Sequence, residues 1–135
     1  MIKIVIVAHG NFAKSLVDTA ELIAGKQENV YTISNEKSDS LIQLQDKIKT
    51  LLSDIIDDDG VLILTDMIGG SPSNASYKMV DIFNVEIISG VNLPMLLSAI
   101  FASKAVKNVL QLSENVFSES QKSIVNIRKY LSDKK

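Results

Sequence analysis

The sequence has no cysteine and no tryptophan, and a single histidine among its 135 residues. Without cysteine the protein cannot use thiol catalysis, a thiolate metal site or a disulfide framework, and this absence favours the cytoplasm as its location. Aromatic residues are also few, with three tyrosines and four phenylalanines, and the formal net charge is -2. A surface that stacks bases and tracks phosphates lacks the residues it needs, so nucleic acid is not an expected partner.

Long apolar runs are missing as well. Lys3 interrupts the apolar N-terminal residues at once, and no later run approaches the length of about 20 residues that a transmembrane helix needs. Neither a membrane span nor a signal peptide is expected. No linker or internal repeat divides the chain, and its length suits one domain. We therefore predict a single cytoplasmic domain over residues 1–135.

Short runs rich in isoleucine and valine alternate with longer amphipathic patterns. The short runs predict four strands, at residues 2–8, 30–33, 61–65 and 85–89. Between them, apolar residues recur every three or four positions and predict helices over 12–23 and 41–55. Gly25 is expected to end the first helix, and Asp39 or Ser40 to cap the second. We predict an α/β fold: an open, mainly parallel, doubly wound sheet of strand order 2-1-3-4, with helices on both faces.

The last third of the chain is less regular. Three elements are predicted there: a helix over residues 93–103, a short extended stretch over 106–112 and a helix over about 114–131. The polar residues 132–135 are expected to fray.

Three consecutive aspartates, residues 57–59, precede the third strand. A cation site would use such a cluster, but three acidic residues in a turn are typical of a solvated loop. No metal site is predicted there.

His9, the only histidine, stands where the first apolar run meets Gly10. A strand that ends there and leads into a helix puts the imidazole at the carboxyl edge of the sheet, where α/β proteins bind ligands. An imidazole also acts as a nucleophile and proton carrier near neutral pH. A hydrogen-bonded structural histidine is the plainer interpretation of this residue alone, so the functional one depends on its neighbours.

The third strand supplies those neighbours. Asp66 follows this strand directly, and in a 2-1-3-4 sheet the strand lies beside that of His9, so the two side chains are expected to meet. Gly69 and Gly70 let the backbone approach a ligand closely, and Ser71 followed by proline is typical of a helix start with Ser71 as N-cap. The N–H groups at such a start suit an anion, and a phosphoryl group is the predicted ligand of residues 69–71.

Together these residues predict phosphoryl transfer through His9. Asp66 would accept a hydrogen bond from one ring nitrogen, orient the ring and stabilise its positive charge while the other nitrogen attacks. The sequence has no apparent set of metal ligands and neither of the glycine-rich nucleotide-binding motifs, so no metal, cofactor or nucleotide donor is predicted. Another phosphoprotein is the expected donor.

Three motifs, in this order along the chain, carry a resemblance to a known family. They are Ala8-His9-Gly10 with Phe12, Thr65-Asp66 with residues 69–72, and Gly-Val-Asn-Leu-Pro-Met-Leu at residues 90–96. Over nearly its whole length the sequence resembles the IIA components of the mannose-type permeases of the bacterial phosphoenolpyruvate:sugar phosphotransferase system (PTS). The resemblance implies that Nε2 of His9 takes a phosphoryl group from the carrier HPr and passes it to a histidine of a IIB component. IIB then phosphorylates the sugar that enters through the membrane components IIC and IID.

The resemblance also implies roles for other residues and for a second copy of the chain. Asp66 would pair with His9, and Ser71 would lie close to the phosphoryl site. A homodimer is implied, in which a C-terminal strand, expected at residues 106–112, pairs antiparallel with the partner's sheet. Ile68 and Ser73 stand where the family often has phenylalanine, and both are expected at the partner-facing rim, where they alter partner binding and not the transfer chemistry. Because the sequence ends at Lys135, IIB is expected on a separate protein.

Two other functions stay open, and a flavin or nucleotide pocket at the switch point of the sheet stays open as well. The phosphocarrier subunit of a dihydroxyacetone kinase has a similar architecture and also uses an early histidine, and IIA-like domains occur as non-catalytic regulatory modules. Residues 69–74 and 92–95 favour the sugar permease, and the sequence has no DNA-binding or ATPase region that would suit a regulator. A phosphoaspartate receiver is disfavoured because His9 stands where its acidic cluster belongs. The identity of the sugar is not encoded in such a carrier.

Overall fold

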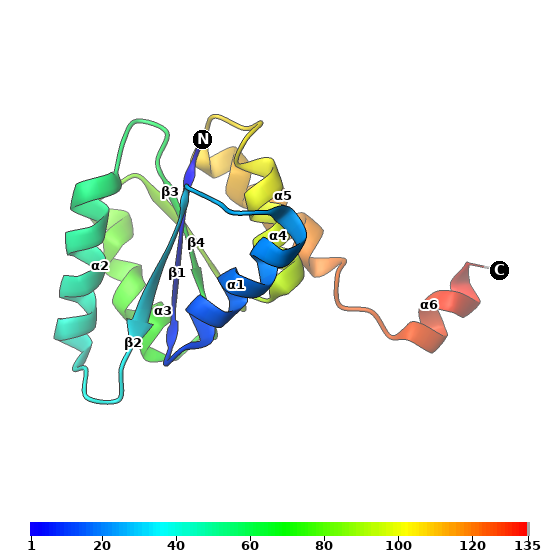
Figure 1. Cartoon of the computed structure of the whole chain (residues 1–135), viewed down its shortest axis with the longest axis horizontal. Helices are drawn as coiled ribbons and strands as arrows, with labels where there is room; N and C mark the ends of the chain where they lie inside the picture. Colours follow the sequence, from blue (N-terminus) through cyan, green and yellow to red (C-terminus); the bar gives the residue numbers. More distant parts are fainter. Residues whose placement is uncertain (135) are drawn as a thin grey trace.

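The computed structural model describes residues 1–134; Lys135, the last residue of the expected polar tail, lies outside the described residues. Four strands form one parallel sheet in the order β2-β1-β3-β4 (Figure 1). Their bounds are Lys3–His9 for β1, Val30–Asn35 for β2, Val61–Thr65 for β3 and Val85–Ser89 for β4. The predicted α/β fold and strand order are confirmed.

Helices cover both faces of this sheet, with α1, α4 and α5 on one face and α2 and α3 on the other (Figure 1). Their bounds are Phe12–Ala24 for α1, Leu41–Ile55 for α2, Ser71–Tyr77 for α3, Leu93–Ala102 for α4, Val109–Gln121 for α5 and Ile127–Asp133 for α6, with a 3-10 turn, η1, at Lys78–Asp81. The helices predicted over 12–23, 41–55 and 93–103 are confirmed to within one residue. Within residues 1–134, no helix has both the length and the apolar composition needed to cross a bilayer.

Alternate residues of the central strands point to opposite faces of the sheet. Ile4 and Ile6 of β1 belong to the core formed with α1, α4 and α5, whereas Val5 and Val7 belong to the core formed with α2 and α3. All four side chains are fully buried. Because both faces of β1 are covered, its sequence is continuously apolar rather than alternating. β1 and β3 are the two central strands and run parallel, so their carboxyl ends lie side by side in the middle of the sheet edge.

Local sequence signals set the ends of the first two helices. Gly25 follows α1 with a φ of 82°, a left-handed value that glycine adopts without steric cost. Ser40 begins α2 through a capping box with Gln43: its hydroxyl accepts the N–H of Gln43 (3.1 Å), and the Gln43 side chain accepts the N–H of Ser40 (2.7 Å). Of the two candidate caps, Ser40 is the one used.

The extended stretch predicted at residues 106–112 is wrong. Residues 106–108 have no regular structure, and Val109 begins α5. Val109, Leu112 and Val116 are all buried, and their spacing of three and four residues is that of one helix face. This periodicity outweighs the β-branched composition of the segment.

The final helix predicted over 114–131 is interrupted. α5 ends at Gln121, and a second helix, α6, begins at Ile127. The side chain of Asn126 accepts the N–H of Lys129 (3.3 Å) and so caps α6. A new N-cap within the amphipathic pattern therefore divides it. α6 continues to Asp133 and so includes the first two residues of the polar tail.

The acidic turn before β3 is partly neutralised by the protein's own lysine. Asp57 accepts a hydrogen bond from Nζ of Lys3 (2.7 Å) and another from the N–H of Asp59 (3.0 Å). The hydrogen bond from Lys3 is the main reason that the pKa of Asp57 lies below the ordinary aspartate value. Asp57 therefore links this turn to the start of β1.

Candidate functional site

His9 is the last residue of β1 and lies at the carboxyl edge of the sheet, as predicted. β1 extends past the end of β3, since Val7 of β1 pairs with Thr65, the last residue of β3. Gly10, with a φ of 53°, then turns the chain toward α1, and its N–H donates to the carbonyl of Asn35 on β2 (3.0 Å). The strand register thus places the His9 side chain at the middle of the sheet edge, where half of its surface (50%) is exposed.

The carboxylate of Asp66 holds His9 through two hydrogen bonds. Its Oδ2 atom lies 2.6 Å from Nδ1 of the ring and accepts the main-chain N–H of His9 at 3.0 Å. Its Oδ1 atom accepts the N–H of Met67 at 2.9 Å. An ionised carboxylate only accepts, so Nδ1 carries the shared proton and Nε2 of the neutral ring keeps its lone pair. The structure therefore brings the two predicted residues together.

Asp66 is mostly shielded from solvent, with 15% of its side chain exposed. This burial by itself raises the pKa of the carboxyl. The hydrogen bonds from the main chain and ring of His9, the positive charge of that ring when it is protonated and the N–H of Met67 together outweigh it, and the pKa lies below the ordinary aspartate value. Asp66 is therefore an anion at neutral pH and is available to stabilise positive charge on the imidazole.

Gly70 lies directly against the imidazole. A Cβ atom at this position would stand 3.2 Å from Cε1 of His9 and 3.2 Å from Cγ of Met67. Its φ of -82° is open to any residue, so the close approach, and not the backbone conformation, is what disfavours a side chain here. Gly69 differs: its φ is +83°, and a Cβ there would have no neighbour within 4 Å. The two predicted glycines thus serve different physical needs.

The start of α3 follows this glycine pair. Gly70 is the N-cap, Ser71 is the first helical residue, and Pro72 comes next. The predicted N-cap role of Ser71 is wrong by one residue, because the extended backbone (ψ 165°) that marks the cap lies at Gly70. Ser71 is exposed and comes directly after the glycine that contacts His9.

Ile68 and Ser73 lie in opposite environments. Ile68, on the loop after Asp66, is 75% exposed, as expected for a rim residue. Ser73 is only 4% exposed, and its hydroxyl donates to the carbonyl of Met67 at 2.6 Å. The expected rim position of Ser73 is wrong, because its hydroxyl finds polar partners inside the protein.

Sequence reasoning missed a cluster of three hydroxyl groups near the loop that follows Asp66. Oγ of Ser73 lies 2.7 Å from Oγ1 of Thr65 and 3.2 Å from Oγ of Ser89. Thr65 and Ser89 are the paired last residues of β3 and β4. A hydroxyl residue at the end of each strand was a visible signal, but only the strand order makes these two residues neighbours.

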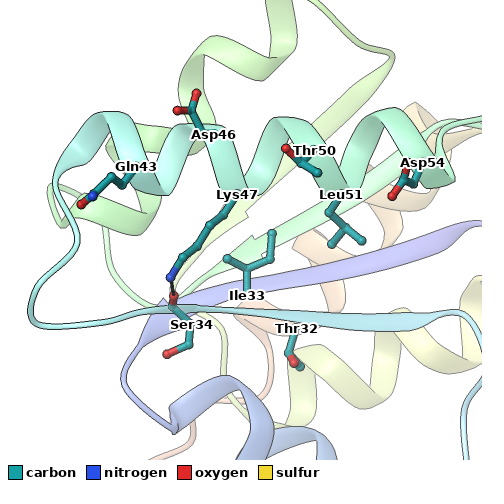
Figure 2. Close-up of a pocket in the computed structure, with 9 residues that line it drawn as sticks. All are labelled: Thr32, Ile33, Ser34, Gln43, Asp46, Lys47, Thr50, Leu51 and Asp54. Atoms are coloured by element: carbon teal, nitrogen blue, oxygen red, sulfur yellow. Dashed lines mark hydrogen bonds between the residues drawn. The ribbon is translucent and has the colours of Figure 1, made fainter.

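A separate groove lies between α2 and β2 (Figure 2). Its volume is about 680 Å³, and none of the predicted site residues lines it. Lys47 reaches across from α2, with Nζ 3.2 Å from the carbonyl of Ser34 (Figure 2) and 2.7 Å from the carboxylate of Asp39. This lysine is already paired with an anion, which does not favour the groove as a phosphate site.

The chain matches a known protein family over most of its length. Residues 3–124 match the family model described as the PTS system fructose IIA component. The chain belongs to this family. It is a IIA component of the mannose family, as its resemblance implied.

Relatives of this IIA chain carry matching descriptions. The mannose-specific EIIAB component of the PTS of Escherichia coli (strain K12) is 41% identical over 102 residues, which cover 75% of this chain and 32% of that protein. The chain thus spans about a third of this longer relative. The fructose-specific EIIA component of Bacillus subtilis (strain 168) is 32% identical over 126 residues, which cover 91% of this chain and 84% of that protein.

A solved structure confirms the IIA fold. The crystal structure of the phosphotransferase system component EIIA from Streptococcus agalactiae superposes with a TM-score of 0.86 at 35% sequence identity. The superposition covers 96% of this chain and 99% of that one.

Proposed function

We propose that this IIA chain is a phosphohistidine carrier, in which Nε2 of His9 accepts a phosphoryl group from HPr and passes it to a IIB component for sugar uptake. The single observation that carries the proposal is the 2.6 Å contact between Nδ1 of His9 and Oδ2 of Asp66. This contact commits one ring nitrogen to the carboxylate and leaves the lone pair on the other. The reactive group is therefore prepared for attack without a metal or cofactor in the proposed step.

The proposed transfer balances in atoms and electrons. The lone pair of Nε2 forms a bond to phosphorus, and the bond between phosphorus and the donor atom of HPr breaks with its electron pair staying on that atom. The ring becomes positively charged while the proton on Nδ1 stays in the hydrogen bond to Asp66. Because Asp66 is anionic and mostly buried, its attraction to this charge is stronger than in water. Transfer onward to a histidine of IIB reverses the same steps.

We propose that residues 69–71 receive the phosphoryl oxygens. Gly70 packs against Cε1, the ring carbon bonded to both nitrogens, so the main chain at Gly70 lies beside the ring and Ser71 directly follows it. The first N–H groups of a helix have no partner within it and suit an anion. The exposed hydroxyl of Ser71 adds a donor at the same place.

The surface around His9 supports a protein donor and acceptor. Phe12, Met67 and Ile68 are large apolar side chains exposed close in sequence to His9 and Asp66. Apolar residues around a reactive group suit a partner protein that covers the site and excludes water during transfer. HPr and IIB are the proposed partners, with the membrane components IIC and IID reached through IIB. The proposed location is the cytoplasm.

A homodimer is also part of the proposal. α6 and the segment that leads to it extend away from the rest of the molecule (Figure 1), and Ile124 (81%), Ile127 and Leu131 are exposed. β4 is an edge strand, and a groove of about 440 Å³ lies between it and α5. A second copy of the chain that covers these side chains removes apolar surface from water. The segment 106–112 is not the proposed contact.

The proposed function is tested by phosphorylating the chain with HPr and phosphoenolpyruvate and mapping the labelled peptide under conditions that preserve phosphohistidine. We expect one label, on His9, and its loss in His9→Ala while the circular dichroism spectrum stays unchanged. Stoichiometric labelling of His9→Ala would refute the proposal.

Offering the labelled chain to a IIB component and to a dihydroxyacetone kinase separates the two carrier functions, and transfer to the kinase alone contradicts the sugar permease function.

A further inference from the structure

Ser73 is linked to the residue that follows Asp66. Its hydroxyl donates to the main-chain carbonyl of Met67 at 2.6 Å. The N–H of the same Met67 donates to Oδ1 of Asp66 at 2.9 Å. Both main-chain polar groups of Met67 are therefore held, one by Asp66 and the other by Ser73.

The hydrogens of this cluster follow from the partners. A hydroxyl has one hydrogen to donate and two lone pairs that accept. Because a carbonyl only accepts, the hydrogen of Ser73 goes to Met67, and the hydroxyls of Thr65 (2.7 Å) and Ser89 (3.2 Å) donate to Ser73. The Ser73 oxygen thus uses its full hydrogen-bonding capacity. Thr65 is fully buried and Ser73 nearly so. The orientation of the Ser73 hydroxyl is therefore set by these partners rather than by solvent.

The segment that Ser73 anchors carries two groups in contact with the imidazole. Asp66, at its start, binds Nδ1 of His9 at 2.6 Å. Gly70, near its end, packs against Cε1. Ser73 itself is on α3, and the hydrogen-bond partners of its hydroxyl are Thr65, Met67 and Ser89 rather than the ring. An effect of Ser73 on His9 is therefore indirect, and it passes through the residues on either side of Asp66 that the Ser73 hydroxyl contacts, Thr65 and Met67.

We propose that Ser73 is a positioning residue for His9: its hydroxyl fixes the carbonyl of Met67, and the loop so held keeps Asp66 on Nδ1. The expected effect on the rate of phosphoryl transfer rests on the proposed function. The expected effect on the tautomer of the His9 ring does not. Without the Ser73 hydroxyl, Met67 turns more freely, Asp66 is less well aligned, and the Nδ1–H tautomer loses its advantage.

The test reads the tautomer of His9, whose ring nitrogens are unique because the chain has one histidine. Nitrogen-15 NMR of the full chain at alkaline pH, where an imidazole is neutral, reports how much of the ring is protonated at Nδ1 and how much at Nε2. We expect the Nδ1–H form to dominate in the wild type and the Nε2–H fraction to rise in Ser73→Ala. Phosphoryl acceptance from HPr should slow on the order of tenfold, with little change in KM.

Ser76→Ala is the matched control. Ser76 is on the same helix and fully buried, and its hydroxyl donates to the carbonyl of Pro72 (2.7 Å) instead of to the loop. Ser76→Ala also removes one buried hydroxyl oxygen, and we expect the wild-type tautomer ratio and the wild-type rate of phosphoryl acceptance. Ser73→Cys keeps a side chain of the same shape, though a somewhat larger one, and its thiol donates only weakly, so it should also raise the Nε2–H fraction if Ser73→Ala does not fold.

A folded Ser73→Ala or Ser73→Cys protein with the wild-type tautomer ratio overturns the positioning role, as does an equal change in Ser76→Ala. If the ratio changes as expected but the wild type is not labelled on His9, the carrier function fails while the positioning role stands.

Discussion

The two nitrogens of the His9 imidazole have different surroundings. Nδ1 faces a carboxylate oxygen at 2.6 Å, and the side chain as a whole is half exposed. That Asp66 meets His9 was predictable, because His9 ends β1, Asp66 directly follows β3 and the two strands are neighbours. The sequence did not show that the same oxygen also binds the main-chain N–H of His9, since this contact depends on β1 extending past β3. The double contact fixes the ring relative to its own backbone.

Asp66→Asn tests the charge at this site without removing its shape. The asparagine oxygen can still accept from His9, but it carries no charge to stabilise the imidazolium that forms during transfer. We expect phosphoryl acceptance to slow by about 100-fold, measured by rapid-quench labelling from HPr, with the fold retained. Asp57→Asn is the matched control, because Asp57 pairs with Lys3 at the opposite end of the sheet. An unchanged rate in Asp66→Asn would mean that the carboxylate is structural.

The loop between β3 and α3 determines the site more than either element does. The bounds of β3 and β4 agree with the sequence prediction to the residue, because both strands are short apolar runs with polar ends. α3 is harder to place, since Ser71 and Gly70 are both acceptable N-caps and the backbone alone decides between them. The residue at the N-cap, Gly70, is also the one that lies against the ring.

Gly70→Ala tests the approach of this loop to the end of β1. The added methyl would lie 3.2 Å from Cε1 of His9 and from Cγ of Met67, so one of them must move. We expect a changed Cε1–H chemical shift of His9 and transfer on the order of tenfold slower, because small displacements of a nucleophile are costly.

Gly69→Ala provides the contrast to this variant. Because alanine is strained at the left-handed φ of residue 69, we expect the free energy of unfolding, measured in urea, to fall by roughly 1 kcal/mol. The added methyl would have no neighbour within 4 Å, so the Cε1–H chemical shift of His9 should stay in place. If Gly70→Ala keeps both the wild-type Cε1–H shift and the wild-type rate, the close approach has no part in the site.

The molecule as a whole has a compact part and a projecting part. The sheet and the helices α1 to α5 share two apolar cores, whereas α6 and the residues before it extend outward (Figure 1). Several apolar side chains on that projection are exposed, including Ile124 and Leu131. A projecting apolar segment is expected to find cover, and a second copy of the chain is the proposed source.

Ile124→Glu tests the proposed dimer. A charge at this 81% exposed position should not disturb either core, but it should weaken a contact that buries the side chain. We expect the dissociation constant from sedimentation equilibrium to rise about tenfold or more. Leu22→Glu is the control, because Leu22 is equally exposed (87%) on α1 and lies outside the projection. A wild type that stays monomeric at high concentration, or equal effects of both variants, argues against this contact.

Periodicity and strand-end residues were enough to predict the parallel sheet, its helices and the meeting of His9 with Asp66, because burial on two faces and the order of elements leave few arrangements. The tertiary structure decided three further matters. Val109 and Leu112 are helical because they share a buried face with Val116, Ser73 is internal because Thr65 and Ser89 come together there, and Gly70 approaches His9 because the loop before α3 closes over the end of β1. The positions of Ser73 and Gly70 depend on contacts between separate elements, which a local pattern does not encode, whereas the spacing of Val109, Leu112 and Val116 is local and burial shows which of two local patterns is used.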